Sequence, residues 1–526
     1  MQTFIFKSTK PGQWILALTS GLLLFLAFPK FDQGWLAWGA LVPLLLAVRK
    51  ANARSGFFLG LATGWVQYLG LLYWTAYTMN VYGDVHLTAS ILVLLLLAGI
   101  LSVYTALFSM FVCLLCRKPW QLFVLAPALW VVLEWLRTWL FTGFPWALLG
   151  YSQYDRLWVI QIADLFGVPG ISALIVLFNS VLAVAVLKWL DQSWQAQPVA
   201  RKTLVRAGVI MAGALLFTAG YGILRIQTVD NAAAKADRAK VAVIQGNIDQ
   251  SVKWDAGFQV LTTAKYRKLS LKAADEGADL IVWPETALPF YLFKDTLLTE
   301  MVLQGIKSIE TDFIIGSPAV NIENGRTDYF NRAYLITSDG SVAGQYDKVH
   351  LVPFGEYVPL KRFLPFVGKM VAQVGDFKPG RRGDTIDWNG KPVGMLICYE
   401  AIFPGLARDM VRNDAQLLVN ITNDAWFGRT SAAYQHYSMS VLRSVETRRF
   451  QARAANTGIS GFIDPVGRIL AASELYVDAT ISAEIALLSG RTLYSRWGDW
   501  PLVTASLLLV SASLIRRRML IENSAS

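Results

Sequence analysis

Val393-Gly394-Met395-Leu396-Ile397-Cys398-Tyr399-Glu400 is an apolar run that ends in a cysteine, a tyrosine and a glutamate. A short continuous apolar run of this kind is typical of a strand that is buried on both faces of a sheet. Two other stretches hold candidate catalytic groups, namely Val282-Trp283-Pro284-Glu285 and Tyr346-Asp347-Lys348-Val349-His350-Leu351. Because strand ends bring distant residues to one edge of a sheet, we expect Glu285, Lys348 and Cys398 to lie together.

Cysteine usage sharpens this expectation. The chain has three cysteines, and two of them, Cys113 and Cys116, lie in an apolar run. Cys398 is therefore alone in the polar region, without a plausible disulfide partner there. A lone cysteine is either a small buried side chain or a nucleophile. Taken singly, Glu285 could cap a helix and Lys348 could be a solvated lysine, so it is the three local sequences together that favour catalysis.

The composition predicts a membrane protein. Apolar residues make up 54% of the 526-residue chain, and the mean hydropathy is +0.42. A bilayer core about 30 Å thick requires about 20 apolar residues per helix. The apolar runs predict about eight spans, at 12–29, 34–48, 57–79, 87–115, 120–142, 166–187, 206–225 and 499–515. The first run ends at Pro29-Lys30 rather than at a small-residue cleavage site, so we expect a span and not a cleaved signal peptide.

These runs divide the chain into three predicted parts. Residues 1–225 form a bundle of about seven spans, residues 226–498 form a polar domain, and residues 499–526 form a last span with a basic tail. The stretch Asp230–Asp237 is predicted to be a linker. Short β-rich runs and helical patterns then alternate, which favours a layered α/β domain. The runs are Val241–Ile244, Leu280–Trp283, Phe313–Ile315, Val393–Ile397 and Leu417–Ile421, and the helical patterns include Leu261–Asp275 and Ala401–Arg412.

The distribution of charge argues against a nucleic-acid partner. The net charge is +11, but residues 225–498 contribute only +2 and the remaining residues contribute +9. With the N-terminus inside, the short cytoplasmic segments hold fourteen Lys and Arg residues, whereas the outer loops hold only Lys30 and Arg156. Cytoplasmic loops of membrane proteins carry such an excess. The pattern predicts that both termini are cytoplasmic and that residues 226–498 face the outer side.

Cysteine, glutamate and lysine together can divide the work of acyl transfer. A thiolate is the competent nucleophile and needs a base or a positive neighbour. Glu285 can accept the thiol proton, and Lys348 can stabilise an oxyanion together with a backbone N–H near Tyr399. His350 and His436 have no metal-ligand spacing with Cys398, so we expect no metal.

The quoted stretches resemble the nitrilase superfamily of carbon–nitrogen hydrolases. With the flanking spans, the whole chain is most similar to the apolipoprotein N-acyltransferase family. The resemblance extends to Gln245-Gly246-Asn247-Ile248-Asp249-Gln250, Lys253-Trp254, Pro353-Phe354-Gly355-Glu356-Tyr357-Val358-Pro359, Asn423-Asp424-Ala425-Trp426-Phe427-Gly428 and Tyr494-Ser495-Arg496-Trp497-Gly498-Asp499-Trp500. It implies a polytopic α-helical membrane bundle that carries an inserted nitrilase-like αββα sandwich.

The resemblance also implies roles for individual residues. Glu285 would be the base, Lys348 the oxyanion stabiliser and Cys398 the nucleophile. A second set would support the site or bind substrate: Glu356 near the lysine, Tyr399 and Glu400 beside the cysteine, Trp254 on a mobile lid, and Trp426. No cofactor is implied.

The implied activity is acyl transfer at a bacterial inner membrane, with the catalytic domain on the periplasmic side. The donor would be a membrane phospholipid, and the acceptor would be the N-terminal amine of a diacylglyceryl-cysteine lipoprotein, through a thioester in a ping-pong mechanism. One alternative is a membrane-tethered amidase or nitrilase that hydrolyses its thioester. Another is a transporter with an outer ligand-binding domain, which would tend to show repeated halves; we detect no repeat.

One apolar stretch suggests how lipid reaches the cysteine. Residues 363–371, Phe363-Leu364-Pro365-Phe366-Val367-Gly368-Lys369-Met370-Val371, lack strand alternation and are interrupted by proline and glycine. This pattern suits a loop or short arm better than a core strand. We expect an arm that dips into the membrane, and the alternative is a buried connector that covers the sandwich.

Overall fold

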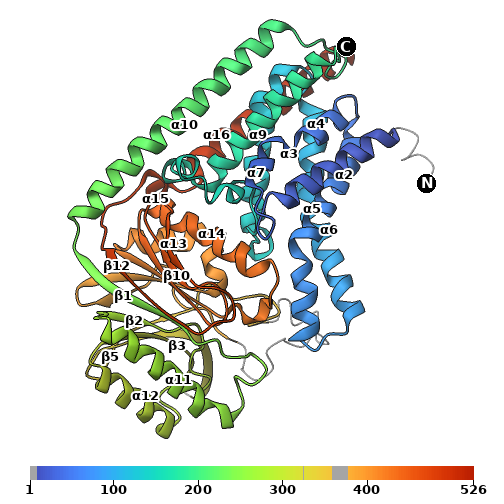
Figure 1. The fold of residues 1–526 in the computed structure, drawn as a ribbon. Helices are drawn as coiled ribbons and strands as arrows, with labels where there is room; N and C mark the ends of the chain where they lie inside the picture. The colour runs from blue at the N-terminus through green and yellow to red at the C-terminus, as the bar shows by residue number, and fades with distance from the viewer. Residues whose placement is uncertain (1–8, 324, 358–376, 526) are drawn as a thin grey trace. The chain divides into compact units, whose positions relative to one another are not determined.

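A computed structural model describes residues 9–323, 325–357 and 377–525 (Figure 1). The expected arm at 363–371 lies outside the described residues. The chain divides into two compact units. The first consists of Met1–Ala76, Thr88–Arg225 and Trp497–Ser526, and the second consists of Tyr77–Leu87 and Ile226–Arg496.

The first unit is helical. Its helices are α2 (Pro11–Leu26), α3 (Ala37–Ala40), α4 (Val42–Val48), α5 (Ala53–Val81), α6 (Leu87–Leu115), α7 (Pro119–Trp139), α8 (Leu157–Ile160), α9 (Ala163–Trp189), α10 (Arg201–Lys235) and α16 (Trp500–Ala525). Short 3₁₀ turns are η1 (Gly34–Leu36), η2 (Leu140–Thr142) and η3 (Leu149–Gln153). The last residues of α5 and of α10 belong to the second unit.

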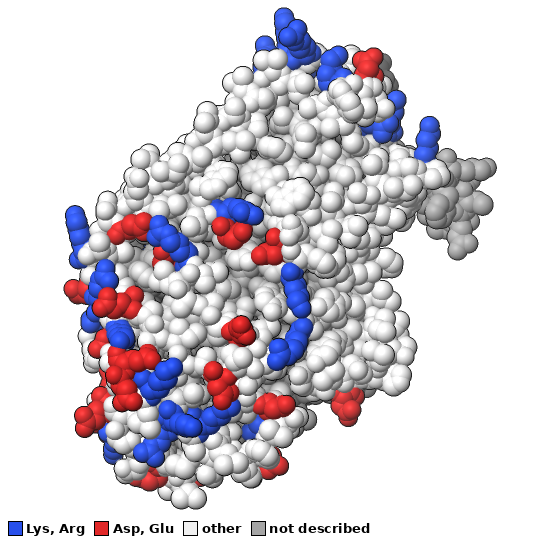
Figure 2. Space-filling model, in the orientation of Figure 1, with Lys and Arg blue, Asp and Glu red and all other residues white. Residues whose placement is uncertain are grey.

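Five helices of the described residues are long and apolar enough to cross a membrane: Ala53–Val81, Leu87–Leu115, Pro119–Thr142, Ala163–Trp189 and Arg201–Lys235. Their surface in Figure 2 is almost free of charged side chains, apart from a mainly basic group at the end near the C-terminus. These features identify a membrane protein. The predicted spans at 12–29 and 34–48 correspond to the shorter apolar helices Pro11–Leu26 and Gly34–Val48. The predicted count of about eight is therefore not confirmed.

The prediction of a linker at Asp230–Asp237 is wrong for most of its length. Helix α10 continues to Lys235 and leaves only Ala236 and Asp237 before the first strand. The physical reason is the run Ala232-Ala233-Ala234, because alanine has the highest helix propensity of all residues.

The second unit contains two six-stranded sheets among the described residues. The first sheet has the order β12-β1-β2-β3-β4-β5 and the second has the order β11-β10-β9-β8-β7-β6. The first is built from β1 (Arg238–Gln245), β2 (Leu280–Val282), β3 (Asp312–Glu323), β4 (Arg326–Ile336), β5 (Val342–Asp347) and β12 (Ala479–Ala486). The second is built from β6 (Thr385–Trp388), β7 (Lys391–Ile397), β8 (Leu417–Thr422), β9 (Phe450–Ala455), β10 (Gly461–Ile463) and β11 (Ile469–Ala472).

The two sheets form the inner layers of a sandwich (Figure 1). Helices α11 (Ala256–Asp275) and α12 (Thr296–Ile309) cover the first sheet, and α13 (Pro404–Arg412) and α14 (Ala432–Thr447) lie on the side of the second. A further short helix, α15 (Leu493–Trp497), follows near the end of the unit. This is the expected nitrilase-like αββα arrangement.

Parallel strands occupy the centre of each sheet and explain the apolar runs in the sequence. Strands β1, β2 and β3 are parallel, as are β7, β8 and β9. Every residue of β2, β8 and β9 is buried, as expected for strands that are covered on both faces. The carboxyl ends of β2, β7 and β8 therefore present the residues that follow them at the edges of two facing sheets.

Candidate active site

Cys398 lies where β7 passes into the 3₁₀ turn η4 (Cys398–Ile402). Its φ of +53° is in the left-handed region, which side-chain-bearing residues adopt at a cost of about 1–3 kcal/mol. The turn is held by Glu400, whose carboxylate accepts the backbone N–H of Ile397 at 2.7 Å. The cysteine residue as a whole is partly exposed, and its backbone is fixed by this turn.

Glu285 follows the carboxyl end of β2 and is buried, with 6% of its surface exposed. A close approach of β3 makes this position possible. A Cβ added to Gly316 would lie 2.4 Å from the Pro284 carbonyl oxygen and 2.8 Å from the Glu285 Cα. Such distances are below van der Waals contact, so only glycine fits at this point of β3.

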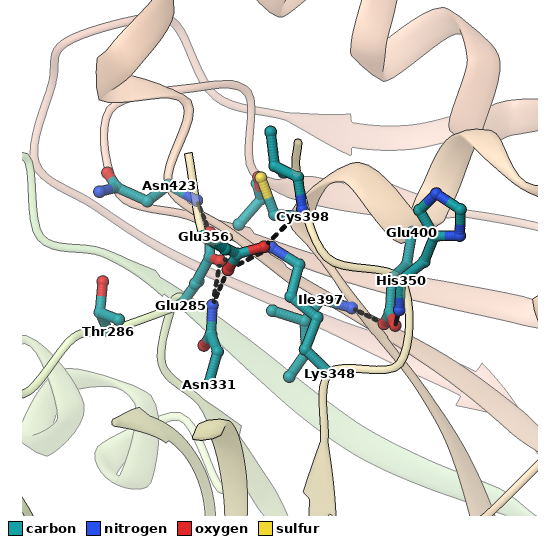
Figure 3. Close-up of polar contacts among 12 residues, drawn as sticks. Glu285, Thr286, Asn331, Lys348, His350, Glu356, Ile397, Cys398, Glu400 and Asn423 are labelled. Atoms are coloured by element: carbon teal, nitrogen blue, oxygen red, sulfur yellow. Dashed lines mark hydrogen bonds and ion pairs between the residues drawn. The ribbon is translucent and has the colours of Figure 1, made fainter. Parts of the chain in front are cut away.

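Lys348 joins two glutamates (Figure 3). Its Nζ lies 3.2 Å from Glu285 Oε1 and 3.0 Å from Glu356 Oε1, and only 1% of its surface is exposed. Asn331, on β4, donates from Nδ2 to the same two oxygens, at 2.7 Å to Glu285 and 2.9 Å to Glu356. The other oxygen of Glu285, Oε2, accepts the backbone N–H of Asn423 at 2.9 Å. The two buried carboxylates are thus satisfied by one ammonium group, one amide and backbone donors.

The electrostatics follow from this arrangement. Burial alone would raise the pKa of Glu285, but the Lys348 charge and the Asn331 and Lys348 hydrogen bonds outweigh it, so the pKa is lowered. Burial opposes the charged form of Lys348 too, yet Glu285 and Glu356 hold its pKa well above the usual value. Both groups are therefore charged at neutral pH.

Cys398, in contrast, is uncharged in the resting site. Burial and the Glu285 carboxylate raise the pKa of the Cys398 thiol, and Lys348 opposes this only in part. The resting group at neutral pH is a thiol and not a thiolate. In Figure 3 the sulfur lies beside the Glu285–Lys348 pair.

Glu400 organises the backbone around the site. Besides Ile397, it accepts the N–H groups of Val349 at 2.6 Å and His350 at 2.9 Å. Burial raises its pKa to about 7, although its backbone donors act in the opposite direction. Glu400 therefore links the turn that carries Cys398 to the segment that follows Lys348.

Three other residues were predicted to support the site or bind substrate, namely Tyr399, Trp254 and Trp426. Tyr399 packs edge-on against Phe403, with ring centroids 5.0 Å apart. Trp254 is half-buried, and no partner for its indole N–H is found among the described residues. Trp426 lies in the 3₁₀ turn η5 (Asp424–Phe427), directly after β8 and Asn423.

Trp426 also contacts a segment that sequence reasoning did not connect with the site. Thr78 Oγ1 donates to the Trp426 carbonyl at 2.8 Å, and the Tyr82 and Trp426 rings lie 5.8 Å apart. Thr78 and Tyr82 belong to Tyr77–Leu87, the part of the second unit that lies far upstream in the sequence. The distance along the chain left no sequence signal for this contact.

Two further residues near Glu285 were not predicted as site residues. Asn331 lies inside β4, where an asparagine gives no signal of its own. Lys253 was quoted only as part of a similar stretch, yet it is 1% exposed and donates from Nζ to Thr286 Oγ1 at 2.9 Å. Burial lowers its pKa to about 7, against the Glu285 charge, which raises it. The place of Lys253 before Trp254, in a stretch similar to the family, is the one signal that could have pointed to it.

Comparison with known proteins identifies the family. Residues 20–181 match the apolipoprotein N-acyltransferase N-terminal domain, and residues 240–493 match the carbon-nitrogen hydrolase family. The apolipoprotein N-acyltransferase of Geobacter metallireducens is 43% identical over 98% of this chain and 97% of its own length. The chain belongs to the apolipoprotein N-acyltransferase family. The same enzyme of Methylococcus capsulatus is 34% identical over 96% of each chain.

Among solved structures, a variant of the amidase from Nesterenkonia sp. AN1, described with an active-site cysteine, is similar to half of the chain. It has 17% identity and a TM-score of 0.37, and the match covers 50% of this chain and 98% of that one. Among the described residues no group of three or more His, Cys, Asp or Glu side chains could hold a metal ion. The family assignment therefore rests on the sequence comparisons.

Proposed function

We propose that this chain N-acylates lipoproteins, with a membrane phospholipid as the acyl donor and the α-amine of a diacylglyceryl-cysteine as the acceptor. The observation that carries the proposal is the convergence of Glu285, Lys348 and Cys398 at strand ends within a membrane protein of this family. Acyl transfer needs a thiol close to a carboxylate and an ammonium group, and these three groups lie side by side here.

The first half-reaction forms a thioester. The Cys398 sulfur attacks the ester carbonyl of the phospholipid while Glu285 accepts the thiol proton. A general base is required here because the resting cysteine is protonated. The C–O bond to the glycerol oxygen then breaks, Glu285 returns the proton to that oxygen, and lysophospholipid leaves.

The second half-reaction transfers the acyl group to the amine. The acceptor amine attacks the thioester carbonyl, and Glu285 takes a proton from the amine nitrogen. The C–S bond breaks, and the sulfur leaves with a proton as the thiol, which restores the resting site. The tetrahedral oxyanion of both steps is stabilised by the Lys348 ammonium group and by a backbone N–H at Tyr399.

The other residues support these steps. Glu356 shares Lys348 with Glu285 and fixes the ammonium group between two carboxylates. Glu400 holds the turn that carries the cysteine. Trp254 and Trp426 would support the site or bind substrate, with Trp254 on a mobile lid. The proposed steps need no metal or nucleotide.

The domain arrangement and the topology belong to the same proposal. About eight spans, seven of them within residues 1–225 and one at 499–515, would put both termini in the cytoplasm. Residues 226–498 would then form the catalytic domain on the periplasmic side of a bacterial inner membrane. Support comes from the charge bias of the loops and from the basic tail Arg516-Arg517-Arg518.

The experiment that tests the function uses purified protein in micelles with phospholipid and a synthetic diacylglyceryl-cysteine peptide. Mass spectrometry of the peptide should show one added acyl chain on the N-terminal amine, together with released lysophospholipid. A peptide with an acetylated N-terminus is the matched control and should gain nothing. Release of free fatty acid without peptide acylation would instead support the amidase-like alternative, in which water clears the thioester.

A further inference from the structure

A fully buried histidine lies behind the nucleophile and takes no part in the steps above. His436, on α14, is 0% exposed, and its Nε2 lies 3.1 Å from the Cys398 carbonyl oxygen. Its Nδ1 lies 3.0 Å from Asp424 Oδ1 and 3.1 Å from Arg453 Nη2. Arg453 also donates to Asp424 Oδ2 at 2.8 Å. A histidine, an aspartate and an arginine thus form one buried network that ends on the backbone of Cys398.

The partners determine which ring nitrogen carries a proton. A carbonyl oxygen can only accept, so Nε2 must carry a proton to bond Cys398. Burial lowers the pKa of His436, and the Arg453 charge acts in the same direction, so the neutral ring is favoured. In that state the Nδ1 lone pair accepts from Arg453, and in the cationic state Nδ1–H donates to Asp424. The Nε2–H therefore faces Cys398 in either state.

The bonded carbonyl belongs to the peptide unit that joins Cys398 to Tyr399. This unit is planar and trans, so its C=O and its N–H point in opposite directions. Fixing the Cys398 oxygen therefore fixes the direction of the Tyr399 N–H, which is the proposed oxyanion donor. Hydrogen bonding at the carbonyl also polarises the unit and strengthens the N–H as a donor.

The backbone at this point needs such a restraint. Cys398 has a φ of +53°, and the peptide that follows would relax if nothing held it. Glu400 holds the preceding side of the cysteine through the Ile397 N–H. His436 holds the following side, and its ring is itself packed edge-on against Phe427 with centroids 6.0 Å apart.

We propose that His436 is a positioning residue that aims the Tyr399 N–H into the oxyanion hole by its hydrogen bond to the Cys398 carbonyl. This inference rests on the proposed function, because it takes Cys398 as the acylated group. His436 itself touches neither the substrate nor the reacting atoms.

Two reactions of Cys398 separate this role from a general structural one. Acylation by phospholipid passes through an oxyanion. Alkylation by iodoacetamide does not: a C–S bond forms at a saturated carbon, iodide leaves and the thiol proton is lost. A residue that aims an oxyanion donor should affect the first reaction and leave the second unchanged.

The variants form a matched set. In His436→Gln, the side-chain amide reaches the position of Nε2 and can still donate to the carbonyl. His436→Asn is one methylene shorter and places its amide near Nδ1, and His436→Leu has no donor. We expect acylation close to the wild-type rate for the glutamine variant. We expect a loss of about 10²–10³ for the asparagine and leucine variants, which is typical of losing one oxyanion contact.

Alkylation of Cys398 by iodoacetamide should proceed at the wild-type rate in all three variants, and half-saturation by phospholipid should not change. Wild-type acylation rates in the asparagine and leucine variants would overturn the proposal. An equal loss of acylation and alkylation would also overturn it, because His436 would then support the nucleophile or the fold. Failure of the wild-type protein itself to form a thioester would refute the proposed function instead.

Discussion

Replacing Asn331 with leucine removes an amide that bridges Glu285 and Glu356. Asn331 Nδ2 lies 2.7 Å from Glu285 Oε1 and 2.9 Å from Glu356 Oε1, and the residue is 3% exposed. Leucine has a similar size but no donor. Glu285 keeps the Lys348 ammonium group and the Asn423 N–H as partners. Its carboxylate is therefore less stabilised in the variant but is not left unpaired.

The size of the effect follows from the two lost bonds. A hydrogen bond to a charged group contributes about 1.5–3 kcal/mol, and about 1.36 kcal/mol equals a tenfold change in a proton equilibrium. The wild-type carboxyl titrates below its usual 4.5, so acylation should persist into mildly acidic solution. In Asn331→Leu the acidic limb of the pH–rate profile for acylation should move to higher pH by about one to two units, through loss of the bond to Glu285. Loss of both bonds should also reduce the stability of the variant by about 3–6 kcal/mol.

The assay is thioester formation on Cys398, followed by mass spectrometry across a series of pH values. Gln451→Leu is the matched control, because Gln451 is also a fully buried amide, but neither of its amide atoms has a partner among the described residues. Its replacement should leave the acidic limb in place and should not reduce stability. An unchanged limb in Asn331→Leu, with the protein folded, would refute the assigned role of the bridge.

Three further predictions concern other parts of the chain. The pKa of Lys253 is lowered from 10.5 to about 7, so between these values the unfolded chain binds a proton that the folded chain lacks. The stability of the wild type should therefore rise with pH relative to that of Lys253→Met, by up to about 1.4 kcal/mol per pH unit. The same dependence of the melting temperature on pH in both proteins would contradict this. Gly316→Ala should slow acylation, because its Cβ would meet the Pro284 carbonyl at 2.4 Å, whereas Gly257→Ala meets only Asp255 Oδ1 at 3.4 Å and should act like wild type. A reporter after Ser526 should be cytoplasmic and one after Lys235 exported, and the reverse pattern would mean that the spans are miscounted.

The sequence predicted those parts of the fold that depend on local pattern. The strands that carry Glu285 and Cys398 are continuous apolar runs, and the structure has them as β2 and β7. Their parallel, doubly covered environment is what made them visible. The prediction of a linker at Asp230–Asp237 was wrong for a local reason too, because a short polar stretch that contains three alanines can extend a helix.

Contacts between distant residues could not be read from the sequence. Asn331 meets Glu285 across 46 residues, and Thr78 meets Trp426 across 348 residues. His436 was interpreted only as a histidine without metal-ligand spacing, since its proposed role depends on a hydrogen bond from α14 to the Cys398 carbonyl. In each case an ordinary polar residue gains its role from tertiary packing, which leaves no periodic signal.

The central claim is that Cys398 accepts an acyl chain from phospholipid with Glu285 as the base. The most direct test is intact mass after incubation with phospholipid alone, followed by peptide mapping. The wild type should gain one acyl chain on Cys398 and release lysophospholipid in equal amount. The diacylglyceryl-cysteine peptide, added afterwards, should remove the acyl chain from Cys398. Cys398→Ala and Glu285→Gln should gain nothing, although both remain folded. An acyl chain on another residue, or normal acylation of Glu285→Gln, would contradict the claim.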